Sequence, residues 1–421
     1  MKAFVKLITL IVLFSLVVSC GGPPATTVAP PPPTTKPGDT PVPPTEVPLS
    51  ANEQWAKDNG LGIYQPATDD WAAIEAAAVK EGSICVYANS SKITKLQAPW
   101  EALYPGIKWD CGDTDSIDVK MRAEQEAGNV VGDVWFNSDG HILYGEFVPN
   151  QWLWSFVPRD VVEPEVTPEF PFAIARHAID VWGYNMEINP EGCPLTNWWN
   201  LTEPALEGKV YIEDPMTDVS TMAKWATVAE HGDEMAAAYK ALYGVEWTTD
   251  PAAATDAFGQ TVINAGWLWI KKMAQNHPTV VDEIDIAYAS VGMDPAVEPG
   301  IGWTGWNSIE DTEAGDIVMA PCLDLNPATG IVKTSYLAVA NMAPHPNAAK
   351  LFIKLALSPD GYKPWDTKGT WSAEPSMAVP EGLPSFEEMM AKSWLMNPIY
   401  DWEWAAKVRD FWAISLLTPS E

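Results

Sequence analysis

Hydrophobic positions over residues 71–136 alternate between a helical period and short continuous runs, a pattern typical of helices interleaved with buried strands. Trp71, Ile74 and Ala78 lie on one helical face, and Gly82 ends that helix. The predicted elements are a helix from 71 to 80–82, a strand over 83–88, a helix over 92–104, a strand over 107–111, a helix from 117 to 128 and a strand over 133–136. This order predicts parallel strands joined by right-handed crossovers, and therefore an α/β fold.

Small polar side chains follow each of these predicted strands. Ligands bind beyond the carboxyl ends of the strands in open parallel sheets, so these segments are candidate ligand contacts. The same side chains could instead cap the helices that follow, and helix N-termini also bind anionic groups. The segments are Asn89, Ser90 and Ser91; Gly112, Asp113 and Thr114; and Asn137, Ser138, Asp139 and Gly140. Their composition suits hydrogen bonding to a polar solute and supplies no obvious pair of nucleophile and base.

A short apolar run over 7–18 follows the basic residues Lys2 and Lys6 and ends at Ser19 and Cys20. The run is too short to span a bilayer and is typical of a secretory signal peptide. Its last residues resemble the lipobox of bacterial lipoproteins, in which the cysteine becomes the lipidated first residue of the mature chain. We therefore expect residues 1–19 to be a lipoprotein signal peptide, with an ordinary signal peptide as the alternative.

The stretch after Cys20 predicts an extended tether. Residues 21–50 contain 11 prolines, and proline fixes φ and removes backbone donors, so the stretch cannot build a packed core. We assign 20–50 to the lipidated cysteine and its tether, and 51–70 to an N-terminal extension of the folded part. No other apolar run is long enough to be transmembrane, so we expect everything beyond Ser50 to be soluble outside the cell.

Charge and composition narrow the range of partners. The chain has 56 acidic and 25 basic residues and a net charge of −31, which makes nucleic acid and anionic membrane surfaces poor partners. The acidity is spread along the chain, which favours a solubility role over attraction of a cationic ligand. The 22 tryptophans suit aromatic walls for sugars or amines, although most are expected in the core.

Three early segments carry a family resemblance: GSICVYANSSK over 82–92, PWEALYPGIKWDC over 99–111 and GDVWFNSDG over 132–140. Together they resemble extracellular solute-binding proteins of bacterial ABC importers, in the group that handles ferric iron, phosphonates, thiamine and polyamines. Further similar segments follow in the expected order at 198–210, 213–221, 265–278 and 343–361, and the last of these is the most specific. The resemblance covers roughly residues 80 to 400.

The resemblance implies a two-lobed, periplasmic-binding-protein-like (type II) α/β fold with a cleft between the lobes. It places lobe one at 71–170 plus 300–375, lobe two with the crossovers at 171–299, and a C-terminal helical segment at 376–421. The apolar run over 172–184 is the expected first crossover.

One departure from the family pattern bears on the ligand. Ferric-binding members carry a Tyr-Tyr pair after the second crossover, whereas this chain reads GIGWTGWN over 300–307, so iron is disfavoured. The five histidines, His141, His177, His231, His277 and His345, are scattered, and we expect no metal and no cofactor.

Strand-end geometry and the resemblance together predict where a solute binds. Trp303 is the test case, because it either stacks on the solute or belongs to the core, and the flanking glycines Gly302 and Gly305 favour a loop. The candidate ligand-binding residues are Asn89, Ser90, Ser91, Asn137, Ser138, Asp139, Asp214, Thr217, Ser220, Thr221, Trp303, Trp306, Asn307 and Trp371.

The expected function is capture of a small polar organic solute by a monomer that closes its hinge and delivers the solute to ABC permease subunits. The sequence contains no GxSxG, HExxH or P-loop motif, and we expect no enzyme activity. A secreted glycan-active enzyme and a two-lobed sensor or adhesin lipoprotein are the alternatives. A carboxylate or phosphonate, an amine and a sugar all remain open as the solute.

Four cysteines remain beside Cys20, and they allow three disulfide pairings. Cys85 and Cys111 fall on predicted neighbouring strands, close enough for a bridge if their side chains share a face. Cys193 and Cys322 would then form the second pair, and four free thiols are the alternative.

Overall fold

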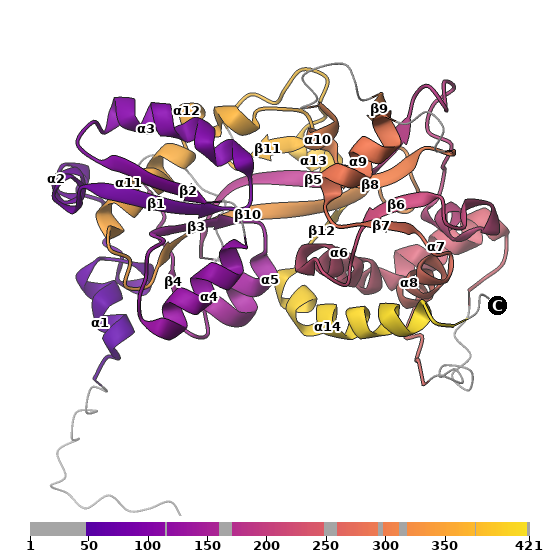
Figure 1. The fold of residues 1–421 in the computed structure, drawn as a ribbon, viewed down its shortest axis with the longest axis horizontal. Helices are drawn as coiled ribbons and strands as arrows, with labels where there is room; N and C mark the ends of the chain where they lie inside the picture. Colours follow the sequence, from indigo (N-terminus) through magenta and orange to yellow (C-terminus); the bar gives the residue numbers. More distant parts are fainter. Residues whose placement is uncertain are drawn as a thin grey trace, which may run out of the picture. The chain divides into compact units, whose positions relative to one another are not determined.

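The computed structural model describes residues 48–113, 116–159, 171–247, 259–293, 298–310, 318–374 and 376–418. The expected signal peptide, Cys20 and the expected tether up to residue 47 lie outside the described residues. Two long crossover strands, β5 (Ala173–Asn185) and β10 (Gly330–Ala340), pair antiparallel between two groups of strands and helices, which we call lobe one and lobe two (Figure 1). Within the described part, no helix is long and apolar enough to cross a membrane.

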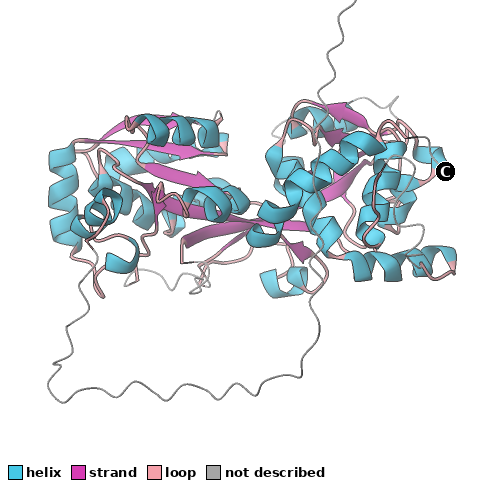
Figure 2. Cartoon of the chain, turned by 90° about the horizontal axis from the view of Figure 1, so that it is seen from below, coloured by secondary structure: helices cyan, strands magenta, loops and turns pink. Residues whose placement is uncertain are grey.

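Hydrogen bonds connect the strands of both lobes into one sheet, in the order β2-β1-β3-β10-β5-β8-β6-β7. The three strands predicted first, β1 (Ser83–Ala88), β2 (Lys108–Asp113) and β3 (Val134–Asn137), pair in parallel. The apolar core nevertheless divides, with one large cluster in each lobe, because the crossover strands alone continue from one lobe into the other. Figure 2 shows the strands of each group lying between helices.

Lobe one also contains the first five α-helices of the described part and the two that follow β10 directly. They are α1 (Ala51–Asp58), α2 (Trp71–Glu81), α3 (Gln97–Leu103), α4 (Ile117–Ala127), α5 (Gly140–Ile142), α11 (Pro346–Ala356) and α12 (Pro359–Tyr362), with the short strand β4 (Leu153–Trp154). Short 3-10 and π segments join them at η1 (Gly62–Tyr64), η2 (Ser91–Leu96), η3 (Leu143–Phe147) and η6 (Lys363–Trp365).

Local chemistry sets the ends of these helices. Asp70 accepts from the backbone N–H of Ala73 at the start of α2, and Gly82 ends that helix with φ of 87°. The single helix expected over 92–104 is instead η2 followed by α3. Pro99 gives the reason, because proline lacks an N–H and is tolerated only in the first turn, so the α-helix begins at residue 97.

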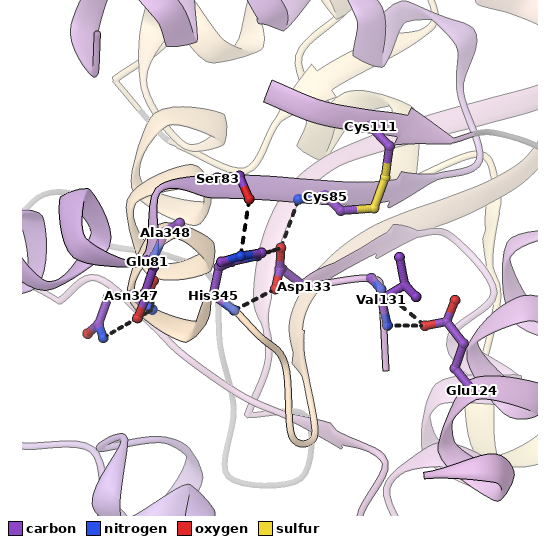
Figure 3. A network of polar contacts seen from close by, with 11 residues as sticks. Glu81, Ser83, Cys85, Cys111, Glu124, Val131, Asp133, His345, Asn347 and Ala348 are labelled. Carbon is purple, nitrogen blue, oxygen red and sulfur yellow. Dashed lines mark hydrogen bonds and ion pairs between the residues drawn. A yellow bond between two sulfur atoms is a disulfide. The ribbon is translucent and has the colours of Figure 1, made fainter. Parts of the chain in front are cut away.

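A buried carboxylate fixes the start of α11 against β1 (Figure 3). Asp133 accepts from the backbone N–H groups of Cys85 and His345, each at 2.8 Å, and contacts His345 Nδ1 at 2.9 Å. The hydrogen bond to Asp133 raises the pKa of His345. Glu81 accepts from the N–H groups of Asn347 and Ala348 and so caps α11 from the end of α2.

Lobe two contains the strands β6 (Val210–Glu213), β7 (Thr279–Val281), β8 (Ile301–Gly305) and β9 (Met319–Pro321). Its helices are η4 (Trp198–Thr202), η5 (Pro204–Leu206), α6 (Val219–Glu230), α7 (Gly232–Tyr243), α8 (Ala265–Gln275), α9 (Ile284–Met293) and α10 (Trp306–Glu310). The last segments are β11 (Thr370–Ser372), α13 (Phe386–Met390), β12 (Trp394–Leu395) and α14 (Pro398–Ser415).

The lobe boundary differs from the expectation. Residues 300–330 were assigned to lobe one, but β8 pairs in parallel with β6, and Ile301, Trp303, Cys322 and Ile331 pack in the core of lobe two. The chain returns to lobe one only along β10. Helix α14, in the expected C-terminal segment, packs its Phe411 and Trp412 into lobe two as well.

Two disulfide bonds join the described cysteines. Cys85 on β1 bonds to Cys111 on β2, its partner in the parallel register, with a Cα–Cα distance of 4.6 Å (Figure 3). Cys193 bonds to Cys322 with a Cα–Cα distance of 5.4 Å. The second bond lies within lobe two, because Cys322 belongs to that lobe's core.

Candidate ligand-binding site

The loops after β1 and β3 meet, as the parallel strand order predicts. Asn89 Nδ2 donates to Ser138 Oγ at 2.7 Å, and Ser90 Oγ accepts from Trp365 Nε1 at 3.1 Å. Neither Ser90 nor Asp139 makes a side-chain cap bond to the helix that follows it. Helix capping therefore does not explain these two residues, and Asn89 and Ser91 keep exposed side chains.

Asn137 organises a buried acidic pair beneath the second loop. Its Nδ2 donates to Asp118 Oδ2 at 3.1 Å and to Asp139 Oδ2 at 2.9 Å. Burial and the charge of Asp139 raise the pKa of Asp118 to about 8. Trp135 Nε1 donates to Asp118 Oδ1 at 2.6 Å, which anchors the pair to β3. Sequence reasoning found Asn137 and Asp139 but missed Asp118, which lies on α4.

His141 of lobe one lies close enough to lobe two for a carboxylate there to influence its pKa. It is buried in α5, and neither ring nitrogen has a hydrogen-bond partner among the described residues. Burial lowers the pKa of His141, while the charges of Asp139 and Asp218 oppose that shift. Asp218 precedes α6 in lobe two, so a lobe-two carboxylate acts on a lobe-one imidazole.

Side chains of the lobe-two loop after β6 accept hydrogen bonds from the loop's own backbone and so stabilise its turns. Asp214 Oδ1 accepts from the N–H of Met216 at 2.9 Å, and Asp218 caps α6 at the N–H of Thr221. Thr221 is buried, and its hydroxyl donates to Glu213 Oε2 at 2.7 Å. Thr221 is therefore a structural residue of the helix start, whereas Thr217 is exposed. Ser220 lies in the first turn of α6 and is half-buried.

A charged cluster lies on the crossover strands and was not found from the sequence. Asp180 of β5 forms ion pairs with Lys224 Nζ of α6 at 2.7 Å and with Lys333 Nζ of β10 at 2.9 Å. Burial opposes ionisation of Asp180, yet the two lysines outweigh it and lower the pKa of Asp180 to about 2. Asp180 and Glu213 in turn hold the pKa of Lys224 above its usual value despite burial. The cluster fixes lobe two to both crossovers.

The predicted aromatic wall is wrong. Trp303 lies in β8, a strand and not a loop, and is fully buried among the tryptophans of lobe two. Trp306 and Trp371 are also buried, in a third apolar cluster, where Trp371 Nε1 donates to the carbonyl of Pro384 at 2.9 Å. The glycines that suggested a loop instead let neighbours approach closely, since Gly305 lies against Asn307. Asn307 is half-buried.

A small pocket lies where lobe one, β10 and the C-terminal segment meet. It is lined by Ser138, Gly140, His141, Thr334, Tyr336, Met396, Pro398 and Asp401. Asp401 is buried, and burial together with the charge of Glu230 raises its pKa to about 8. The pocket therefore combines polar groups from lobe one, from a crossover and from the helix that packs on lobe two. Among the described residues, no three His, Cys, Asp or Glu side chains gather as metal ligands.

Known structures resemble this architecture, although no family model and no curated protein matches the chain. Iron-bound HitA from Pseudomonas aeruginosa is similar with a TM-score of 0.57 and 17% identity, over 79% of this chain and 99% of that chain. The chain has the type II periplasmic-binding-protein fold.

Two further solved structures share this fold. One contains a bound sugar phosphate, and the other is an ABC transporter substrate-binding protein. AfuA from Actinobacillus pleuropneumoniae, with fructose-6-phosphate bound, has a TM-score of 0.57 and 15% identity, over 80% of this chain and 99% of that chain. An ABC transporter substrate-binding protein from Bradyrhizobium japonicum has a TM-score of 0.56 and 16% identity, over 80% and 99% of the two chains. At these identities the likeness concerns the fold.

The periplasmic-binding-protein fold brings together only part of the predicted site. The loops at 89–91 and 137–139 meet in lobe one, and Asp218, rather than Asp214, is the lobe-two acid that acts on His141, just after the second loop. The missed residues are Asp118, Arg176, Asp180, Lys224 and Lys333. A signal for two of them was present, because Arg176 and Asp180 are charges with even spacing on an otherwise apolar crossover strand.

Proposed function

We propose that this chain is the solute-binding component of an ABC importer, tethered through a lipid on Cys20 to the outer face of the membrane. One observation carries the proposal: polar side chains of lobe one, of a crossover strand and of α14, which packs on lobe two, line one small pocket that includes His141, Thr334 and Asp401. A solute that contacts both lobes stabilises the closed state over the open one, and closure is what a permease would recognise. The solved structures that share the fold are binding proteins, which supports a binding role over an enzymatic one.

Ligand-induced closure provides the test. The purified chain would be screened by thermal shift against carboxylates, phosphonates, amines and sugars, and each hit would be followed by small-angle X-ray scattering. A solute at a hundredfold excess over Kd should stabilise the protein by about 2.7 kcal/mol and reduce its radius of gyration. Asp401→Ala removes an acid that lines the pocket and should weaken the response, whereas Asp233→Ala, an exposed acid on α7, is the matched control and should leave it unchanged.

Two results would count against the proposal. Hydrolysis of glycans or esters by the wild-type protein would favour the enzyme alternative, and binding without closure would favour an adhesin. The anchor is tested separately, because Cys20→Ala should abolish labelling by a radioactive fatty acid and release the protein from the membrane fraction. A sensor role remains distinguishable from import by uptake measurements in cells that lack the protein.

A further inference from the structure

Arg176 is a buried cation that forms no hydrogen bond or ion pair with the residues that the structure describes. It lies on crossover strand β5 with 6% of its surface exposed, and its Nε has no hydrogen-bond partner among the described residues. None of the described acids forms an ion pair with it. The guanidinium lies over the ring of Trp365, 5.4 Å from the centroid. Asp180 acts on it electrostatically but is already bound by Lys224 and Lys333.

The polar groups around Arg176 are hydroxyls that have no hydrogen-bond partner among the described residues. Ser335 on β10 is its direct partner in the antiparallel register, so the two side chains share one face of the sheet. Tyr362 is close enough for its phenol and Arg176 to shift each other's pKa. Thr370 on β11 pairs with Ala178, two residues along the same face. The hydroxyls of Ser335, Tyr362 and Thr370 are all buried, and none has a partner among the described residues.

Leaving these buried polar groups without partners costs free energy of folding, and a ligand that binds between them would remove that cost. Buried polar groups in folded proteins are nearly always hydrogen-bonded, and a buried charge is normally paired. Burial lowers the pKa of Arg176 only to about 10, so the side chain is still charged at neutral pH. A guanidinium with three hydroxyl groups offers donors in a fixed fork, which matches the oxygens of a carboxylate or a phosphoryl group.

The site also adjoins the candidate ligand contacts of lobe one. Trp365, which stacks under Arg176, donates to Ser90 Oγ, and Ser90 lies beside Asn89 and its partner Ser138. The crossover cluster adds Lys224 and Lys333, with Asp180 as their ion-pair partner and with Glu213 and Asp218 also acting on Lys224. Three cationic side chains, those of Arg176, Lys224 and Lys333, therefore lie on or against the crossover strands.

We infer that the solute is a small organic anion, and that Arg176, assisted by Ser335, Tyr362 and Thr370, binds its carboxylate or phosphoryl group. The inference rests on the proposed function and selects one of the solute classes that the sequence left open. It places the anionic end of the solute on the crossover strand, where contact with the other lobe completes on closure.

The test compares Arg176→Met and Arg176→Lys with the matched control Arg122→Met. Arg122 is an arginine of the same lobe that forms a bidentate ion pair with Glu146, at 2.6 Å for both bonds. The probes are succinate, citrate, methylphosphonate, glucose-6-phosphate, glucose and putrescine, each added to the purified full chain in thermal-shift and calorimetric titrations. Succinate and citrate report a carboxylate site, and methylphosphonate and glucose-6-phosphate report a phosphoryl site.

The wild type should respond to at least one anionic probe. Arg176→Met should weaken that binding by about 30-fold or more, the effect of removing one partner of a buried charge pair, with Arg176→Lys intermediate. Without ligand, Arg176→Met should melt no lower than the wild type, because it removes an uncompensated buried charge. Arg122→Met should melt lower than the wild type and keep its response to the anion.

Four results would overturn the inference. Wild-type affinity of Arg176→Met for the anion would show that Arg176 does not bind it. A melting temperature of free Arg176→Met that is lowered as in Arg122→Met would make Arg176 a structural residue. A wild type that responds only to glucose or putrescine would exclude an anionic solute and leave the proposed binding function standing. A wild type that responds to none of the probes would count against both.

Discussion

Replacing Trp303 with alanine tests whether this residue belongs to the core or to the ligand site. Its side chain is fully buried in lobe two, with ring centroids 5.0 Å from Trp182, 5.6 Å from Trp198 and 5.7 Å from Trp225. The indole N–H is also buried and has no partner among the described residues. The structure therefore predicts a loss of stability and no direct loss of solute contacts.

The magnitude follows from buried area. A tryptophan buries roughly 200 Å², which at about 25 cal/mol per Å² corresponds to about 5 kcal/mol. Alanine retains part of this, and the change relieves an unsatisfied N–H that costs about 1–3 kcal/mol. These two contributions leave about 1–3 kcal/mol, and the cavity left by the ring adds to it, so the net destabilisation should be about 3–4 kcal/mol, within the range of about 3–5 kcal/mol for truncation of large aromatic residues. Trp303→Phe keeps an aromatic ring and removes the N–H, so it should cost about 1 kcal/mol or less.

Urea unfolding followed by far-UV circular dichroism measures these differences, with the disulfides intact. Ile63→Ala is the control, because Ile63 is 90% exposed and its truncation should change stability by less than about 0.5 kcal/mol. Each variant would also be titrated with the solute that stabilises the wild type. The folded fraction of Trp303→Ala should bind that solute with unchanged affinity.

Two outcomes would refute the reasoning. A stability of Trp303→Ala within about 1 kcal/mol of the wild type would mean that the side chain is not packed in the core. A loss of affinity in a variant of normal stability would place Trp303 on the solute after all. An equal cost for Trp303→Phe and Trp303→Ala would contradict the packing role assigned to the aromatic ring, because both variants remove the indole N–H and only Trp303→Phe keeps a ring.

The remaining predictions concern buried charges. Because the pKa of Asp118 is raised to about 8, the folded state keeps a proton that the unfolded state releases near pH 4, so stability should fall as pH rises from about 4 to 8. Asp118→Asn should flatten this dependence, as measured by urea midpoints across that range, and an unchanged slope would contradict the assignment. Lys224→Met leaves Asp180 with Lys333 alone and should cost about 3–5 kcal/mol, part of which the double variant with Asp180→Leu should recover. If the double variant is no more stable than Lys224→Met, Asp180 is not the group left uncompensated.

The order of helices and strands in lobe one was predictable from the sequence, because local patterns determine it. Trp71, Ile74 and Ala78 share a helical face, and the helix they predict ends at Gly82, where the backbone adopts a positive φ. The run over 83–88 lies in a strand buried along most of its length. The expected crossover over 172–184 corresponds to β5. Such signals depend only on residues that are close together in the sequence, so they predict these elements without knowledge of long-range contacts.

Tertiary structure alone decided which side chains are buried in the core and which polar groups are brought together. The sequence around Trp303 has the glycines of a loop, but pairing of β8 with β5 and β6, more than 90 residues away along the chain, makes it a core strand. Likewise, Arg176 and Asp180 become a site only through the antiparallel register that sets Ser335 and Lys333 beside them. Period and turn chemistry determine the elements of this protein, whereas burial and charge pairing depend on long-range strand register, which no local pattern encodes.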